Sequence, residues 1–365
     1  MHGFAMVSRK TWLYGKDREV ARMLNCSGIL NRRVLSTVLK NLVCLILVLV
    51  GIVSIEAQTK TSGIVTIYTS VPENLMNEIA PLFAKARPGY SLKVYRSGTP
   101  DIMAKLEAEA KSGKINADVV WVAETTSAED LKDLNLLRPY TSSEATNIPA
   151  QLKDAAGYYY GSRLINMVLA YNTLKVKEPK SWNAMLDPAY RGKVGIPSPA
   201  NSGSALYALG SIVNRADMGW KFIEAVRANG GVQLKNNSDA VQKVASGEIF
   251  LAIALDYQVK NFRDSGSPIS YAVPEEGLVM VVSPVALLKG SPNPKGGEIF
   301  LEYVLSKDCQ EFMSASQSVV PVRTDVTPPR GVPSLETLKA MQSDAVFIKK
   351  NKGALVEHFM SIMTK

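Results

Sequence analysis

The sequence predicts an α/β protein built of two lobes that are joined by a hinge. Residues 92–122 follow the pattern strand, tight turn, helix and apolar strand, and such a unit implies a parallel sheet covered by helices. Two long apolar runs, at residues 157–171 and 278–288, flank a middle section that has its own strands and helices. A chain that passes twice between two lobes forms a hinge with one cleft between them.

The first 57 residues differ from the rest and are predicted to be a signal peptide with an N-terminal extension. Two arginines and a lysine precede an apolar run at residues 42–55, and Ala57 offers a cleavage point. This run of about 14 residues is short for a membrane span of ~20 residues, so we expect cleavage, with an uncleaved anchor as the alternative. The mature protein is then expected in the periplasm or otherwise secreted.

The charge of the mature chain argues against a nucleic-acid role. The leader holds eight of the 42 basic and three of the 33 acidic residues. The mature chain therefore has 34 basic and 30 acidic residues, and its formal charge is +4 instead of +9. A mild positive charge suits a small anionic ligand better than a nucleic acid. Cys309 is the only cysteine after the leader, so we expect no intrachain disulfide and a fold that depends on a large core.

The two crossing segments divide the mature chain between the lobes. We expect lobe 1 to hold residues 58–165 and 280–365, and lobe 2 to hold residues 166–279.

Three strands are each followed by a turn rich in serine, threonine or glycine and then by a helix. The free backbone N–H groups at a helix start bind small anions when they lie just past a strand end. The alternative is an ordinary helix cap at each place. The candidate ligand-binding residues at these junctions are Thr69 and Ser70, then Ser97, Gly98 and Thr99, and finally Ser202, Gly203 and Ser204.

Four further side chains are candidates because charged or polar groups are unusual beside apolar strands. Arg163 starts the strand that makes the first crossing, within the run at residues 157–171, and could donate two hydrogen bonds to a phosphate or carboxylate, or else form a surface salt bridge. Glu124 ends an apolar strand, where a carboxylate is costly unless it is paired or faces a cleft. Asp256 and Tyr257 follow another apolar strand and could bind sugar hydroxyls, an amine or a metal.

Segments spread over residues 60–350 resemble the periplasmic substrate-binding proteins of ABC importers, in the type II fold. The resemblance is to the branch that holds ferric-iron, phosphonate and sugar-phosphate binders. Each segment is weakly specific, but their combination is specific for the family. The matching segments are TIYTS at 66–70, RSGT at 96–99, ADVVWVAE at 117–124, RLINMVLAYNT at 163–173, SWNAMLDPAYRGKVGIPSP at 181–199, GEIFLAIALDY at 247–257 and YAVPEEG at 271–277.

The resemblance implies that the chain captures a solute by hinge closure and delivers it to a membrane ABC permease, as a monomer and without a cofactor. Iron-binding members carry two adjacent tyrosines where this chain has Asp256 and Tyr257. Fe³⁺ as the transported ligand would use these two residues as metal ligands, with Glu124 and one tyrosine of residues 158–160. A phosphate or phosphonate ligand suits the three helix starts better, and the ligand stays open between these classes.

An enzymatic role is not expected. The chain has no GxSxG, HExxH, CxxC or Walker pattern, and the mature part holds a single histidine, His358. A periplasmic sensor subunit, whose closed form would dock a receptor instead of a permease, is the alternative from another functional class.

Overall fold

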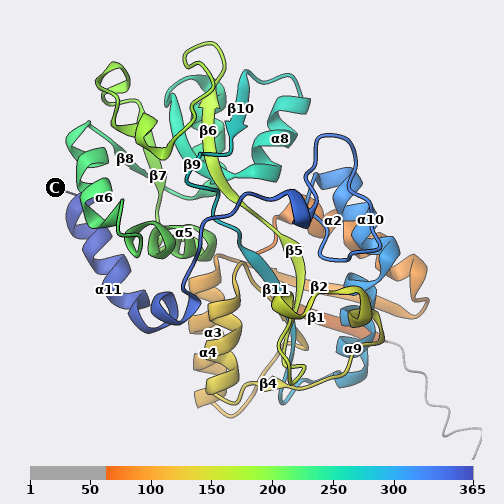
Figure 1. The fold of residues 1–365 in the computed structure, drawn as a ribbon. Coiled ribbons are helices and arrows are strands. Elements are labelled where there is room, and N and C mark those ends of the chain that lie inside the picture. Colours follow the sequence, from red (N-terminus) through yellow and green to blue (C-terminus); the bar gives the residue numbers. More distant parts are fainter. Residues whose placement is uncertain (1–62, 365) are drawn as a thin grey trace, which may run out of the picture. The chain divides into compact units, whose positions relative to one another are not determined.

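Two β-sheets organise residues 63–364, which are the residues that the computed structural model describes (Figure 1). The predicted leader lies outside them. The first sheet has the order β2-β1-β3-β11-β4, and β5 also pairs with β11. Strands β1, β2 and β3 are parallel, whereas β11 runs antiparallel to its neighbours. Its strands are β1 (Gly63–Thr69), β2 (Tyr90–Arg96), β3 (Val119–Trp121), β4 (Leu137–Arg138), β5 (Tyr160–Leu164) and β11 (Val282–Leu288).

The second sheet has the order β10-β6-β9-β7-β8. Strands β7, β8 and β9 are parallel, and β6 is antiparallel to both of its neighbours. We call the first sheet with its helices lobe 1, and the second sheet with its helices lobe 2. The strands of the second sheet are β6 (Met167–Asn172), β7 (Val194–Pro197), β8 (Val232–Leu234), β9 (Leu251–Leu255) and β10 (Ile269–Ala272).

Helices cover both faces of each sheet, as the apolar strands predict. In β3 the side chains alternate, so that Val119 and Trp121 enter one core and Val120 enters the core on the other face. The helices are α2 (Glu73–Ala86), α3 (Thr99–Lys111), α4 (Thr125–Asp133), α5 (Gly203–Val213), α6 (Gly219–Ala228), α7 (Asn237–Ser246), α8 (Asp256–Asp264), α9 (Pro294–Leu305), α10 (Lys307–Gln317) and α11 (Ala345–Met363).

The chain passes between the sheets in segments that lie side by side. Strand β5 leads into β6 through Ile165 and Asn166, and the Ile165 backbone N–H donates to the Val281 carbonyl at 2.9 Å, in the segment that returns to β11. A third passage follows α10: Leu338 packs on the lobe 1 core, whereas Met341 lies in the lobe 2 core. The sequence did not reveal this passage, because it has no regular secondary structure.

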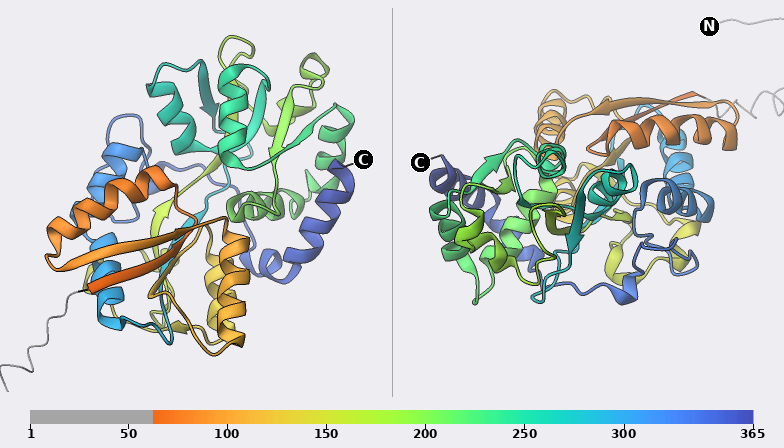
Figure 2. Two further views of the ribbon diagram at one scale, coloured as in Figure 1. Left: turned by 180° about the vertical axis from the view of Figure 1, so that it is seen from behind. Right: turned by 90° about the horizontal axis from the view of Figure 1, so that it is seen from above.

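The last helix belongs to the lobe 2 core. Sequence analysis placed residues 280–365 in lobe 1, but the structure has a 3₁₀ turn at Leu335–Thr337 and then α11, whose buried apolar side chains belong to the lobe 2 core. Helix α11 packs along α5 and α6 of lobe 2 (Figure 2), and Gly210 of α5 permits the contact because a Cβ there would lie 2.6 Å from Ile348 Cγ1. Among residues 63–364, no helix combines the length and apolarity that a membrane crossing needs.

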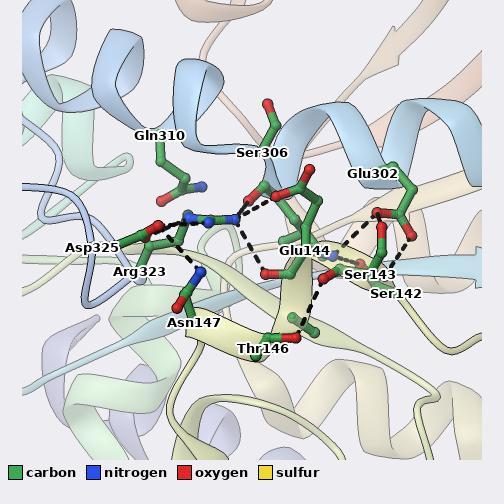
Figure 3. A network of polar contacts seen from close by, with 12 residues as sticks. Ser142, Ser143, Glu144, Thr146, Asn147, Glu302, Ser306, Gln310, Arg323 and Asp325 are labelled. Carbon is green, nitrogen blue, oxygen red and sulfur yellow. Dashed lines mark hydrogen bonds and ion pairs between the residues drawn. The ribbon is translucent and has the colours of Figure 1, made fainter.

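A buried arginine fixes the segment after α10 to lobe 1 (Figure 3). The Arg323 guanidinium pairs with the Glu144 carboxylate at 2.6 Å and with Asp325 at 2.8 Å. It also donates to the Leu305 carbonyl oxygen at 2.9 Å. With these partners the cation is well compensated, so its role is to hold three segments together.

Candidate functional site

A cavity of about 400 Å³ lies between the two lobes. From lobe 1 it is lined by residues at the ends of β1 and β2, the start of α3 and strand β5, and from lobe 2 by the starts of α5, α7 and α8. The structure brings nine of the predicted residues together at this cavity: Ser70, Ser97, Gly98, Thr99, Arg163, Ser202, Gly203, Ser204 and Tyr257.

Two glycines let the helix starts of the opposing lobes meet beside the cavity. A Cβ on Gly98 would lie 2.8 Å from the backbone oxygen of Asn201. A Cβ on Gly203 would lie 3.0 Å from Thr99 Cβ. Larger residues at these positions would therefore push the lobes apart, so the structure represents a closed arrangement of the lobes.

Arg163 is the most unusual residue of the cavity. Its side chain is 1% exposed, and its guanidinium lies 5.3 Å from the centroid of the Trp121 ring. The Nη2 group donates to the Ser283 hydroxyl at 3.1 Å, but Nε and Nη1 have no hydrogen-bond partner among the described residues. Burial lowers the pKa of Arg163, and the neighbouring Tyr257 opposes this shift. The cavity thus contains a cation whose hydrogen-bonding capacity is largely unused.

Tyr257 lies beside this arginine at the start of α8. Burial raises the pKa of the Tyr257 phenol, whereas the nearby Arg163 lowers it. The Gln258 amide donates to the Tyr257 hydroxyl at 3.3 Å, so the phenol proton stays free for another acceptor.

Two candidate residues, Thr69 and Glu124, form their hydrogen bonds within lobe 1 and do not line this cavity. The Thr69 hydroxyl donates to the Trp121 carbonyl at 2.7 Å and accepts from the Val71 N–H at 3.0 Å. The Glu124 carboxylate caps α4, accepting from the Ser127 N–H at 2.8 Å and from the hydroxyls of Thr126 and Ser127. The Thr69 hydroxyl is therefore used within lobe 1, and its predicted place at the ligand is corrected. Glu124 does lie where the lobes meet, because a Cβ on Gly203 would be 3.2 Å from its Oε1, and it lines a second cavity there together with Leu206 and Lys352.

Asp256 is also directed away from the cavity. Its carboxylate accepts from the Asn166 side-chain amide at 2.7 Å, from the Asn166 N–H at 3.1 Å and from the Tyr257 N–H at 2.8 Å. Burial raises its pKa to about 7. Asp256 therefore ties the start of α8 to the first crossing segment, and the expectation that it contacts ligand or metal is corrected.

The predicted oxygen ligands for iron do not converge. The Tyr159 hydroxyl donates to Glu129 at 2.6 Å, the Tyr160 hydroxyl donates to the Tyr140 carbonyl at 2.5 Å, and none of residues 158–160 lines the cavity. Tyr257 is the only tyrosine that lines it. Within residues 63–364 no group of three or more His, Cys, Asp or Glu side chains is arranged to hold a metal ion.

Comparison with known proteins assigns the chain to a family. The model of the bacterial extracellular solute-binding proteins matches residues 78–340. The chain belongs to this family. It is 24% identical over 307 residues to iron uptake protein A1 of Synechocystis sp., covering 80% of this chain and 84% of that protein. It is 23% identical to the major ferric iron-binding protein of Neisseria meningitidis, covering 82% of this chain and 93% of that protein.

Solved structures give the same fold. The periplasmic binding protein AfuA from Actinobacillus pleuropneumoniae, solved with exogenous fructose 6-phosphate bound, matches with a TM-score of 0.73 at 21% identity, covering 82% of this chain and 98% of that chain. The predicted family and the predicted type II fold of two α/β lobes are confirmed. The chain is thus a solute-binding protein of the kind that serves ABC transporters.

Several residues that sequence analysis did not select also line the cavity of this solute-binding protein. Arg96 and Lys235 are exposed cations from opposite lobes, and Asn237 and Gln258 contribute amides. Asn237 follows strand β8 at the start of α7, so the strand–turn–helix pattern at residues 232–239 was a signal that could have identified it. Arg96 and Gln258 are next to predicted residues in the sequence, but no sequence pattern marks either of them as a site residue.

Proposed function

We propose that this solute-binding protein captures a small organic anion that bears a phosphate or phosphonate group, and delivers it to an ABC permease. The unpartnered N–H groups of buried Arg163 carry the proposal. A guanidinium with unused N–H groups can donate charge-assisted hydrogen bonds to phosphate oxygens, and bonds of this type are strong.

The rest of the cavity supports an anion. Arg96 and Lys235 add positive charge at its exposed side, against the single carboxylate of Asp101. The first N–H groups of helices α3 and α5 lack intrahelical partners and favour negative charge. The fructose 6-phosphate bound to AfuA is a ligand of this class in a protein with the same fold.

Hinge closure follows from the division of these groups between the lobes. Arg163 and the start of α3 belong to lobe 1, whereas the starts of α5 and α7 belong to lobe 2. A ligand that bridges them makes contacts in the closed form that it lacks in the open form. Only such differential contacts shift the equilibrium towards closure. The closed form would then dock on the permease.

Ferric iron is the second candidate, because two relatives named above are iron proteins and Tyr257 faces the cavity. Thermal unfolding of the chelator-treated protein separates the two candidates. A ligand at a hundredfold its dissociation constant stabilises the folded state by about 2.7 kcal/mol, which raises the midpoint temperature by several degrees. We expect this shift with glycerol 3-phosphate or a hexose 6-phosphate. A shift with Fe³⁺-citrate alone, accompanied by a tyrosinate–iron absorption band, would contradict the proposal.

The transport role has its own test, because a periplasmic sensor would bind the same ligand. Deleting the gene should abolish uptake of the radiolabelled ligand into cells. Undiminished uptake, combined with loss of a ligand-dependent transcriptional response, would favour the sensor role.

A further inference from the structure

We propose that Ser283 is a positioning residue, which holds the guanidinium of Arg163 in the orientation that binds the ligand. The inference rests on the proposed function and adds to the site a residue that does not itself line the cavity. Ser283 is fully buried in β11, the strand that follows the return crossing. Its basis is a hydrogen bond of fixed direction, an aromatic contact and an irregularity in the pairing of two strands.

The Ser283 hydroxyl is fixed in direction by a second partner. It donates to the Val122 carbonyl oxygen at 2.7 Å, and a serine hydroxyl has only one proton. Towards Arg163 the same oxygen can therefore only accept, and it takes a hydrogen bond from Nη2 at 3.1 Å. This bond anchors one end of the guanidinium and leaves Nε and Nη1 without a partner among the described residues.

The Trp121 ring restrains the same guanidinium from another side. The Arg163 guanidinium carbon lies over this ring, 5.3 Å from its centroid, and a planar guanidinium interacts favourably with an aromatic face. Trp121 is itself fully buried and contacts Phe300 edge to face, with 6.2 Å between the ring centroids. A ring contact together with one directed hydrogen bond limits both the position and the rotation of the planar group.

An irregular pairing of β5 with β11 brings Ser283 and Arg163 together. Ser283 lies opposite Arg163, but the register shifts directly after Ser283, so Ser162 is an extra residue in β5. Bulges of this kind re-aim side chains and occur often beside functional sites. The extra residue is well bonded, because the Ser162 hydroxyl donates to the Ser283 carbonyl at 2.8 Å and the Gln310 side-chain amide donates to the Ser162 carbonyl at 2.7 Å. The irregularity is thus a stable part of the fold.

These restraints favour binding because an arginine that is already oriented loses less side-chain freedom when the ligand arrives. The alternative is that Ser283 only satisfies one buried donor and competes with the ligand for it. The two roles predict effects of opposite sign. Loss of the hydroxyl weakens ligand binding if Ser283 positions the guanidinium, and strengthens binding if Ser283 competes.

Isothermal titration calorimetry on the purified full chain tests the inference. The probes are glycerol 3-phosphate, glucose 6-phosphate and 2-aminoethylphosphonate, and the one that binds most tightly is used for the variants. We expect Ser283→Ala to weaken its binding about tenfold. Ser211→Ala is the matched control, since Ser211 is 1% exposed and donates to the Tyr207 carbonyl at 2.8 Å away from the cavity. It should change the affinity less than about twofold.

A second pair of variants separates the hydroxyl from the shape of the side chain. Ser283→Thr keeps the hydroxyl, whereas Ser283→Val has the same branched shape without it. Both add a similar volume to a buried position, so the difference between them isolates the hydroxyl. Ser283→Val should bind the probe about tenfold more weakly than Ser283→Thr. This comparison remains informative if Ser283→Ala fails to fold.

A double-mutant cycle with Arg163→Met distinguishes positioning from a general structural role. In the Arg163→Met background the loss of the Ser283 hydroxyl should change the affinity less than about twofold, because the hydroxyl acts only through the guanidinium. A residue that merely supports the shape of the cavity would weaken binding to the same extent in both backgrounds.

The outcomes separate this inference from the proposed function. Suppose that Arg163→Met weakens binding of the phosphorus probe about a hundredfold. Unchanged or tighter binding by Ser283→Ala would then overturn the positioning role and leave the organophosphate function in place. Equal weakening by Ser283→Ala with and without Arg163 would have the same meaning. Binding of Fe³⁺-citrate with no binding of any of the three probes would overturn both.

Discussion

Lobe 1 buries two arginines in opposite surroundings. Arg323 is 6% exposed and donates to the carboxylates of Glu144 and Asp325, which Figure 3 labels, and to the backbone carbonyls of Glu144 and Leu305. Arg163 is 1% exposed and has one protein acceptor, the Ser283 hydroxyl. A buried cation with its partners in place is compensated by them, and removing it would leave those partners unpaired. A buried cation without them is costly to the fold and becomes favourable when a ligand supplies the missing acceptors.

Arg163→Met tests the comparison with the largest expected effect. The substitution removes both unpartnered donors, so binding of an organophosphate should weaken by about a hundredfold or more. The unfolding free energy without ligand should stay the same or rise, because an uncompensated buried charge is replaced by an apolar side chain of similar length. Calorimetry and urea unfolding measure the two effects. Unchanged affinity would remove Arg163 from the site.

Arg323→Met should give the reverse result. It leaves the Glu144 and Asp325 carboxylates without their cation, and we expect a loss of about 2 kcal/mol of unfolding free energy, moderated because both carboxylates are about one-third exposed. Ligand affinity of the folded protein should change less than about threefold. Loss of binding without loss of stability would contradict the distinction between the two arginines.

The buried carboxyl group of Asp256 can be compared with the two arginines through the pH dependence of the unfolding free energy. Burial raises the pKa of Asp256 to about 7, above its value of ~3.9 in an unfolded chain. Between about pH 4 and pH 7 the unfolded chain releases this proton while the folded protein retains it. The Asp256 contribution to stability therefore falls as pH rises through this window, and levels off above it.

Asp256→Asn should remove that fall, as measured by urea unfolding at pH 4.5 and 7.5. Asp325→Asn is the matched control, because Arg323 lowers the pKa of Asp325. The control should leave the decline between these pH values in place. An identical pH dependence in Asp256→Asn and the unmodified protein would show that Asp256 does not titrate in this window.

Gly98→Ala has the smallest expected effect and tests whether Arg163 acts in the closed form. Its Cβ would lie 2.8 Å from the Asn201 carbonyl oxygen across the lobes, so closure should be hindered and affinity reduced about tenfold, the equivalent of ~1.4 kcal/mol. Gly353→Ala, with no atom within 4 Å of the new Cβ, is the control. Small-angle scattering with ligand should show a larger radius of gyration for Gly98→Ala alone.

Sequence patterns predicted the helix starts at the cavity but not the use of each polar group. Ser97, Gly98 and Ser202 lie at the cavity because a turn after a strand places them at the strand end, which is a local property of the chain. Thr69 and Asp256 also lie at strand ends, but their side chains have other partners. The Thr69 hydroxyl bonds to the Trp121 carbonyl, and the Asp256 carboxylate accepts from the Asn166 amide, and both partners are distant in sequence. A sequence shows that a polar residue ends a strand, and it does not show which partner the fold brings to it.

The sequence by itself determined the two α/β lobes, the crossing strands and the glycine- and serine-rich helix starts, because hydrophobic periodicity and turn chemistry act over short stretches. Only the tertiary structure decided that α11 packs on lobe 2 and that Arg163 is unpaired while Arg323 is paired. Those properties depend on contacts between segments far apart in the chain, and the hydrogen-bonding state of a buried group is fixed by such contacts.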